Sequence, residues 1–118
     1  MGWIYRMAGC VFCRIINGEA VSDILYEDDH VVVIRDLFPQ APVHLLAIPR
    51  EHIPSASHVE DPLVWANLMN SVKIVARNLE LNEDGYRIVV NCGHQAGQSV
   101  GHLHVHILSG RKFRWPPG

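Results

Sequence analysis

The stretch that decides both the fold and the chemistry of this chain reads Gly97-Gln98-Ser99-Val100-Gly101-His102-Leu103-His104-Val105-His106-Ile107-Leu108. Histidines alternate with apolar residues in its second half, which predicts a β-strand over residues 102–108. The three histidines then share one face of the strand, and the apolar residues between them face a hydrophobic layer. Three neighbouring imidazoles are costly to bury without partners. A solvent-exposed polar face would more often use Thr, Lys, Glu or Ser, so the pattern favours a functional site.

Two kinds of site need several histidines on one face. The histidines can ligate a metal, or one of them can be a nucleophile that the others support. The preceding loop, residues 97–101, bears on this choice. Its small residues let backbone N–H groups approach an anion closely, and Gln98 and Ser99 add an amide and a hydroxyl. Donors beside a nucleophile suit phosphoryl or nucleotidyl transfer, because negative charge builds on the non-bridging oxygens.

The segments around this stretch predict an α+β fold. A short helix is predicted over residues 10–17, and a long helix begins at Asp61-Pro62. Strands are predicted over residues 24–27, 31–35, 43–48 and 86–91, besides the histidine strand. The long helix carries an apolar stripe that we expect in the core, namely Trp65, Met69, Val72, Ala76 and Leu79. Most connections are too short for helical crossovers, so the five strands should form a mainly antiparallel sheet.

The composition is that of a single globular domain. The chain has 118 residues, of which 48% are hydrophobic and 19% charged. We expect a domain over residues 10–118, preceded by an N-terminal extension of residues 1–9. A net charge of −2 without any basic block argues against a nucleic acid duplex as partner. No apolar run is long enough to span a membrane, so no membrane partner is expected.

The chain has three cysteines, Cys10, Cys13 and Cys92. An odd number of cysteines without an export signal favours a reducing, cytoplasmic location. In that setting the Cys10-Val11-Phe12-Cys13 segment has the spacing of half a zinc site or of a redox pair. The alternative is a pair of small buried apolar residues on a short helix.

The histidine stretch resembles the signature of the histidine-triad (HIT) superfamily, in which three histidines alternate with apolar residues. The resemblance extends from about Cys10 to Gly118. The C-terminal Trp115-Pro116-Pro117-Gly118 is similar to the ending of the Hint branch, the nucleoside phosphoramidases. The resemblance implies a homodimeric hydrolase that acts on purine nucleoside 5′-phosphoramidates or acyl-nucleotides and releases the nucleoside monophosphate.

The resemblance also implies roles for single residues. His104 is expected to attack the α-phosphorus and form a nucleotidyl-histidine, with the backbone around His102 fixing the tautomer of its ring. The other residues implied in catalysis are His102, His106, His44 and Ser99. Asp36 is expected to bind the ribose hydroxyls and Leu37 to wall the base. The remaining residues implied in nucleotide binding are Asn91, Gly97, Gln98, Ser99, His104 and His106.

The resemblance further implies a structural zinc ion on Cys10, Cys13, His52 and His102. Zinc is not required for the chemistry, because many proteins of the Hint branch lack the cysteine pair. Two other functions stay open at this point. One is cleavage of dinucleoside polyphosphates, as in the Fhit branch, although the C-terminal tail favours the phosphoramidase. The other is a zinc-bearing dimeric scaffold that binds nucleotides without catalysis that matters in the cell.

Overall fold

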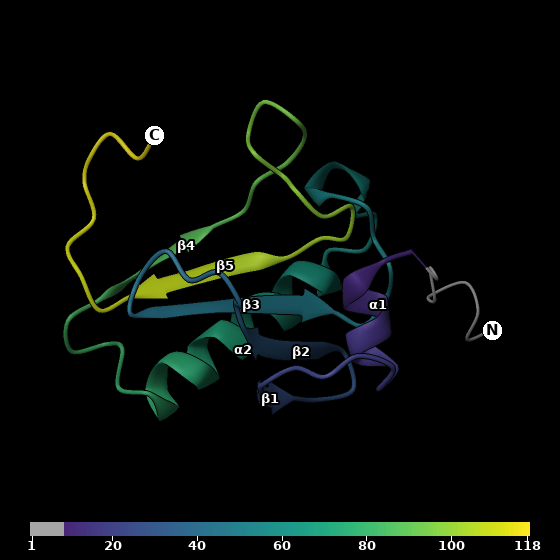
Figure 1. The fold of residues 1–118 in the computed structure, drawn as a ribbon, viewed down its shortest axis with the longest axis horizontal. Coiled ribbons are helices and arrows are strands. Elements are labelled where there is room, and N and C mark those ends of the chain that lie inside the picture. Colours follow the sequence, from purple (N-terminus) through teal and green to yellow (C-terminus); the bar gives the residue numbers. More distant parts are fainter. Residues whose placement is uncertain (1–8) are drawn as a thin grey trace.

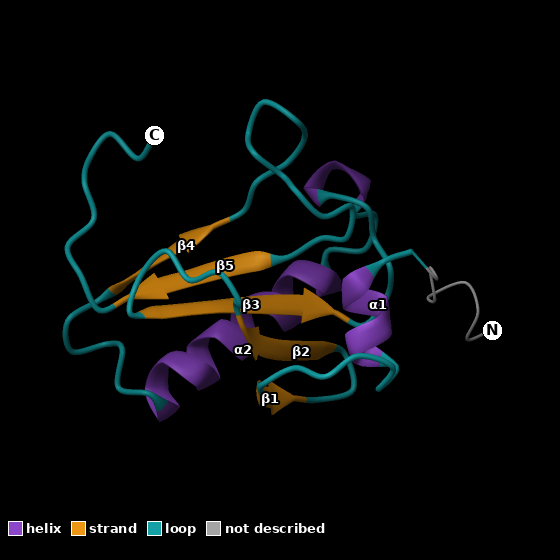
Figure 2. Ribbon diagram, in the orientation of Figure 1, coloured by secondary structure: helices purple, strands orange, loops and turns teal. Residues whose placement is uncertain are grey.

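The structure, a computed structural model, describes residues 9–118. Its elements are α1 (Val11–Ile16), β1 (Ile24–Glu27), β2 (Val31–Arg35), β3 (Val43–Pro49), the short 3-10 turn η2 (Ala56–His58), α2 (Leu63–Asn78), β4 (Tyr86–Val89) and β5 (Val105–Ser109). Figures 1 and 2 show one layer of strands with α2 behind it and α1 beside the end of β3. Apart from Gly9, the expected N-terminal extension lies outside the described residues.

The five strands form one sheet in the order β1-β2-β3-β5-β4, and every neighbouring pair is antiparallel. This confirms the predicted α+β fold with a five-stranded antiparallel sheet. A tight turn joins β1 to β2, in which the Asp28 carboxylate accepts the N–H groups of His30 and Val31. The central pair places Leu46 of β3 opposite His106 of β5, and His44 opposite Leu108. The sheet register therefore brings His44 and His106 onto one face, two residues apart along the strand direction.

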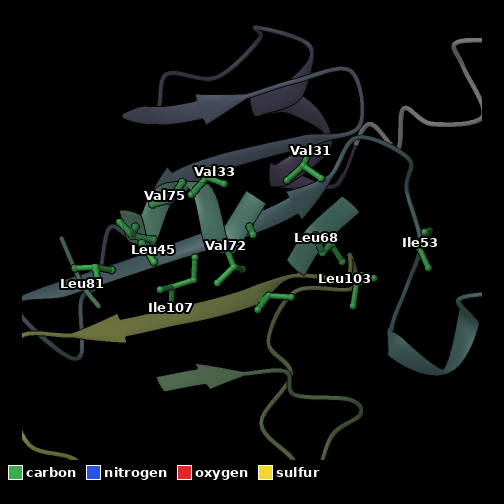
Figure 3. Close-up of a cluster of buried hydrophobic side chains, with 13 residues drawn as sticks. Val31, Val33, Leu45, Ile53, Leu68, Val72, Val75, Leu81, Leu103 and Ile107 are labelled. Carbon is green, nitrogen blue, oxygen red and sulfur yellow. The ribbon is translucent and has the colours of Figure 1, made fainter. Parts of the chain in front are cut away.

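The two faces of the sheet bury separate hydrophobic clusters. On β2, Val31 and Val33 pack into the cluster beneath α2, whereas Val32 and Ile34 pack into the other. Figure 3 shows the first cluster, where Leu68, Val72 and Val75 of α2 lie against the strand residues. The apolar residues of the histidine stretch also belong to the first cluster, namely Leu103, Val105 and Ile107. The histidines between them consequently belong to the opposite face of the sheet.

The buried stripe of α2 differs from the predicted one. Val72 and Ala76 are buried as predicted, but Met69 and Leu79 are 37% and 38% exposed. The buried positions are Leu68, Ser71, Val72, Val75 and Ala76. They recur at i, i+3, i+4, i+7 and i+8 from Leu68, so the face that meets the sheet is rotated about the helix axis toward Leu68 and Val75 relative to the predicted stripe. The sequence pattern alone could not fix this rotation, because apolar residues flank the buried face on one side.

Helix α1 lies over the second cluster, on the histidine face of the sheet. Phe12, Cys13 and Ile15 are buried there with Leu46 and Ile48 of β3. The Cys10 thiol caps the helix by accepting the N–H of Cys13 at 3.4 Å. A helix of six residues has little stability of its own, so α1 depends on these contacts for its position. Neither helix in residues 9–118 has the length and hydropathy that crossing a bilayer requires.

Candidate functional site

The histidine stretch is extended, but its ladder is shorter than predicted. Strand β5 begins at Val105, and pairing with β3 ends where Val105 meets Ala47. His102 and His104 therefore precede the strand instead of belonging to it. Just before the strand, the Leu103 N–H bonds to the carbonyl of Ile53 at 2.7 Å, in the segment after β3. The alternation of buried apolar residues and histidines nevertheless persists through this segment.

The ring of His104 has one nitrogen committed and one free for chemistry. Its Nδ1 lies 2.7 Å from the carbonyl oxygen of His102, and a carbonyl can only accept, so Nδ1 carries the proton. Nε2 of the neutral ring then keeps its lone pair, as a nucleophile requires. The ring packs edge-on between Phe12 and His106, with centroids 5.1 and 5.0 Å away. The resemblance to the HIT superfamily implied such a contact with the His102 backbone.

The tautomers of His44 and His106 follow from a chain of hydrogen bonds. The Gln40 backbone N–H donates to Nδ1 of His44 at 3.0 Å, so the His44 proton sits on Nε2. This Nε2–H donates to Nδ1 of His106 at 2.9 Å. The proton of neutral His106 is therefore on its own Nε2. These hydrogen bonds leave an N–H donor at Nε2 of His106 and an unprotonated Nε2 on the neighbouring His104 ring. Group transfer needs such a pair, with one proton donor and one nucleophile.

Burial keeps these two rings neutral. Desolvation, with smaller contributions from the neighbouring rings of His104 and His44, lowers the pKa of His106 to about 4, although the Asp36 carboxylate acts in the opposite direction. The pKa of His44 is also lowered by burial, although Asp36 pulls in the opposite direction. The 3.4 Å contact between His44 Nε2 and Asp36 Oδ2 is consequently the approach of a carboxylate to a neutral imidazole whose Nε2–H is donated to His106, not an ion pair.

A second group of side chains, the thiol–imidazole cluster, consists of Cys10, Cys13, His52 and His102. Nδ1 of His102 lies 3.4 Å from Sγ of Cys10, 3.6 Å from Sγ of Cys13 and 3.1 Å from Nδ1 of His52. Nδ1 of His52 lies 3.2 Å from Sγ of Cys13. A tetrahedral zinc ion with ordinary bond lengths has its S and N ligand atoms about 3.5 Å apart and two N atoms about 3.3 Å apart. The cluster thus has the ligand types and nearly the spacing of a closed zinc site.

The outer nitrogen of His102 supports this reading. Its Nε2 donates to the carbonyl of Pro49 at 2.9 Å, which leaves Nδ1 unprotonated and facing the two thiols. Burial lowers the pKa of His102 to about 4, so the ring is neutral. His52 is half-buried and lines a cavity of about 280 Å³ together with Glu51, Glu60 and Asp61. A hollow with three acidic residues therefore lies beside the cluster on its His52 side.

Asp36, His44 and His106 are also close enough to one another to hold a metal. Their protonation argues against it. A metal at Nε2 of His44 would displace the proton to Nδ1, where it would oppose the Gln40 N–H that already points there. The same proton now bridges two rings. The chemistry of the two groups therefore differs, since the thiol–imidazole cluster presents lone pairs and the Asp36 group presents a hydrogen-bonded proton chain.

The glycine-rich loop lies between β4 and β5. Gly97 has a φ of 89°, a left-handed conformation that favours glycine, and its N–H bonds to the carbonyl of His94. The Gln98 amide accepts from the Gly93 N–H and donates to the carbonyls of Pro54 and Val100. This amide braces the loop, so it does not present an N–H to an anion as expected. Ser99 is exposed, and half-buried Asn91 follows the end of β4.

Asp36 and Leu37 follow β2 at the edge of the site. One carboxylate oxygen of Asp36 accepts the Phe38 N–H at 2.8 Å, and the other faces His44. Leu37 and Phe38 are 78% and 80% exposed, so both present apolar surface to solvent next to this carboxylate. A larger cavity of about 680 Å³ lies elsewhere and contains none of the expected site residues. Its Arg50 is held by Glu27 and the carbonyl of Asp28.

Sequence reasoning missed three participants. The carbonyl of Pro49 and the N–H of Gln40 set ring tautomers, and no side-chain pattern announces a backbone group. Phe12 touches the rings of both His102 and His104. One signal for Phe12 was present in the sequence, namely its place between Cys10 and Cys13. A residue between two ligands of a metal site must lie close to that site.

Comparison with known proteins agrees with this geometry. The family model described as HIT domain matches residues 17–113. An uncharacterized HIT-like protein of Synechocystis is 46% identical over 110 residues, covering 92% of this chain and 96% of the relative.

Three solved structures have the same fold. A HIT family hydrolase from Legionella pneumophila has a TM-score of 0.89 at 42% identity, covering 93% of this chain and all of that one (100%). A histidine triad nucleotide-binding protein from Candida albicans has a TM-score of 0.81 at 30% identity, with coverage of 93% and 85%. A Zn-bound histidine triad family protein from Mycobacterium smegmatis has a TM-score of 0.80 at 32% identity, with coverage of 88% and 76%.

Proposed function

This chain belongs to the HIT domain family, and from that premise we propose that it is a nucleotide hydrolase or transferase with His104 as its nucleophile. Its proposed substrates are purine nucleoside 5′-phosphoramidates or acyl-nucleotides, and its product is the nucleoside monophosphate. Similar structures described as a hydrolase and as a nucleotide-binding protein support the general activity. The observation that carries the proposal is the 2.7 Å bond from His104 Nδ1 to the His102 carbonyl, which leaves the other ring nitrogen free to attack.

The proposed reaction has two steps, and each of them exchanges one bond at the α-phosphorus for another. In the first, Nε2 of His104 forms a bond to the α-phosphorus while the bond from phosphorus to the leaving group breaks. The ring becomes cationic, and its Nδ1–H stays on the His102 carbonyl, which stabilises that charge. In the second step, water attacks the phosphorus and the bond to Nε2 breaks. This restores neutral His104 and releases the monophosphate.

His106 handles the proton of the leaving group. A protonated His106 gives Nε2–H to the departing nitrogen or oxygen in the first step and takes a proton from water in the second. This form carries a second proton on Nδ1, so the His44 Nε2–H, which bonds to Nδ1 in the free site, would turn to the Asp36 carboxylate 3.4 Å away. Because burial lowers the pKa of His106 to about 4, the free site does not hold that extra proton at neutral pH. An anionic phosphate beside the ring favours the charged form. Substrate binding and proton uptake are therefore coupled in this proposal.

Recognition of the nucleotide falls to residues around these rings. The Asp36 carboxylate accepts the ribose hydroxyls, and the exposed Leu37 provides apolar surface for the base. Ser99 and the backbone around Gly97 supply donors to the phosphate, with Asn91 at the border of the site. Gln98 contributes indirectly, by holding the loop in shape through its bonds to Pro54 and Val100.

A structural zinc ion on the thiol–imidazole cluster is a further part of the proposal. Cys10, Cys13, His52 and His102 would hold it, and four protein ligands leave no position for water. The ion would supply a rigid link between α1 and the histidine segment, with no part in the chemical steps. The similar protein from Mycobacterium smegmatis, described as Zn-bound, supports this assignment.

We also propose a homodimer. The tail residues Trp115, Pro116 and Pro117 would reach toward the partner's site, and Trp115 is 82% exposed in the single chain. Sedimentation that finds only monomer at micromolar concentration would contradict the dimer.

Turnover of adenosine 5′-phosphoramidate and of diadenosine tetraphosphate tests the function. We expect the phosphoramidate to be cleaved faster, and His104→Ala to lower kcat at least about 1,000-fold. The exposed histidine of the β1–β2 turn provides a matched control, His30→Ala, which should retain wild-type turnover. An alkaline quench should trap the nucleotide on wild-type protein and not on His104→Ala. If neither substrate is cleaved faster by wild type than by His104→Ala, the proposed function fails.

A further inference from the structure

Six rings form an unbroken row across the histidine face, in the order His52, His102, Phe12, His104, His106 and His44. Successive centroids are 4.8, 5.8, 5.1, 5.0 and 5.2 Å apart. We call this set the ring row. Its first two members belong to the thiol–imidazole cluster, and its last three belong to the site of phosphoryl chemistry. Phe12 is the member that joins the two parts.

Phe12 is well placed to transmit position from one part to the other. It is 6% exposed and meets the rings of His102 and His104 edge-on, at interplanar angles of 83° and 74°. On α1 it lies between Cys10 and Cys13, so both neighbouring thiols belong to the same cluster. Two bonds from a metal to these thiols would restrain α1 on either side of Phe12.

We propose that Phe12 is a positioning residue that couples metal occupancy of the thiol–imidazole cluster to the orientation of the His104 ring. The proposal rests on the proposed function of His104 as the nucleophile. Phe12 does not touch the reacting atoms. It acts by holding one side of the His104 ring while His106 holds the other.

The physical basis is the small number of restraints on each partner. A six-residue helix has little stability of its own, so the anchoring of α1 decides where Phe12 lies. Within residues 9–118, one hydrogen bond and two ring contacts orient the His104 ring. If the Phe12 contact loosens, the ring can rotate away from the tautomer-fixing carbonyl, and Nε2 loses its alignment. Misalignment of a nucleophile by about 1 Å can lower the rate by two orders of magnitude.

The experiment compares zinc-loaded and chelator-treated protein by two measurements. The imidazole ¹⁵N spectrum at fixed pH reports the tautomer of His104, assigned by its loss in His104→Gln. Steady-state kinetics with adenosine 5′-phosphoramidate report kcat and KM separately. The variants are Phe12→Leu, which keeps apolar bulk but removes the ring, and Val11→Ala as the control. Val11 is the residue before Phe12 on α1, is 42% exposed and has no place in the ring row.

In wild type, metal removal should move the ¹⁵N chemical shifts of the two His104 ring nitrogens toward values averaged over two tautomers. It should also lower kcat about tenfold, with KM changed less than about twofold. Phe12→Leu should show the averaged spectrum and the lower kcat even with zinc bound, and metal removal should change it little further. Val11→Ala should respond to metal as wild type does.

Three results would overturn the proposal. The first is a Phe12→Leu variant that responds to metal as wild type does, in spectrum and in kcat. The second is a rise in KM with kcat unchanged, which would make Phe12 a wall of the base site. The third is a wild-type protein that binds no zinc. The spectra need no turnover, so they decide the coupling even if the substrate is not cleaved and the proposed function fails.

Discussion

Zinc binding to the thiol–imidazole cluster should raise the melting temperature of the protein by roughly 10 °C. Three of the four ligand residues are buried. Four pairs of their ligand atoms already lie 3.1 to 3.6 Å apart and every pair lies within 4.8 Å, so binding needs little rearrangement. A ligand that binds only the folded state at 100 times its Kd stabilises that state by about 2.7 kcal/mol. For a chain of 118 residues, each 1 kcal/mol raises Tm by roughly 4 °C.

The assay is thermal unfolding followed by circular dichroism, on chelator-treated protein with and without added zinc. Cys13→Ser removes a thiol that is 1% exposed and should abolish most of the zinc-dependent shift. Cys92→Ser is the matched control, because Cys92 is exposed and lies outside the cluster. It should keep the full shift.

Two results would refute the reasoning. One is a wild-type Tm that zinc does not change, which would mean that the near-tetrahedral spacing of the four residues does not form a zinc site. The other is a Cys13→Ser variant that retains the whole shift, which would place the bound zinc somewhere else. Loss of the shift in Cys92→Ser would point to the same second conclusion.

Three further predictions concern acid stability, the core and the ribose contact. In metal-free protein, the free energy of unfolding should fall as pH drops from about 6.5 to about 4. Burial lowers the pKa of His106 in the folded protein to about 4, so in this pH range the His106 ring takes up a proton in the unfolded chain and not yet in the folded one. Urea denaturation over this range checks it, and the fall should be smaller in His106→Gln. Leu68→Ala, at a fully buried position of α2, should lower the free energy of unfolding by about 3 kcal/mol in urea denaturation, whereas exposed Val11→Ala should lower it by less than about 1 kcal/mol. Asp36→Ala should raise KM about tenfold for a ribonucleotide substrate but leave KM for a 2′,3′-dideoxy analogue nearly unchanged, and an equal rise for both would contradict a ribose role.

Local pattern was sufficient to predict most of the fold. The strands at residues 24–27 and 31–35 have their predicted bounds, since turn residues on both sides delimit them. The predicted strand at residues 86–91 ends earlier, at Val89, and the histidine strand starts later, at Val105. Both differences lie at the same end of the β4–β5 pair. There the ladder depends on a neighbouring strand, which a single segment of sequence does not reveal.

The site was predictable in its side chains but not in its backbone partners. Alternation placed the three histidines together, and the resemblance to the HIT superfamily grouped His52 with Cys10 and Cys13. The free nitrogens of the rings follow instead from the Pro49 and His102 carbonyls and the Gln40 N–H. Backbone groups of these kinds do not depend on the side chain, so the residue type does not reveal them. Gln98 illustrates the opposite limit. Its amide suits an anion by chemistry, yet three-dimensional neighbours use it to brace the loop.

The point at which β5 stops pairing with β3 has a consequence for efforts to make this protein more heat-resistant. The His102 carbonyl is free to accept from the His104 ring because, within residues 9–118, the β3–β5 ladder ends at Val105. Substitutions that extend this ladder by two residues would make the segment more rigid and would draw the carbonyl away from the ring of the proposed nucleophile, His104. Screening for thermal tolerance alone would therefore select inert molecules, and only a screen that also demands turnover would keep this short irregular segment intact.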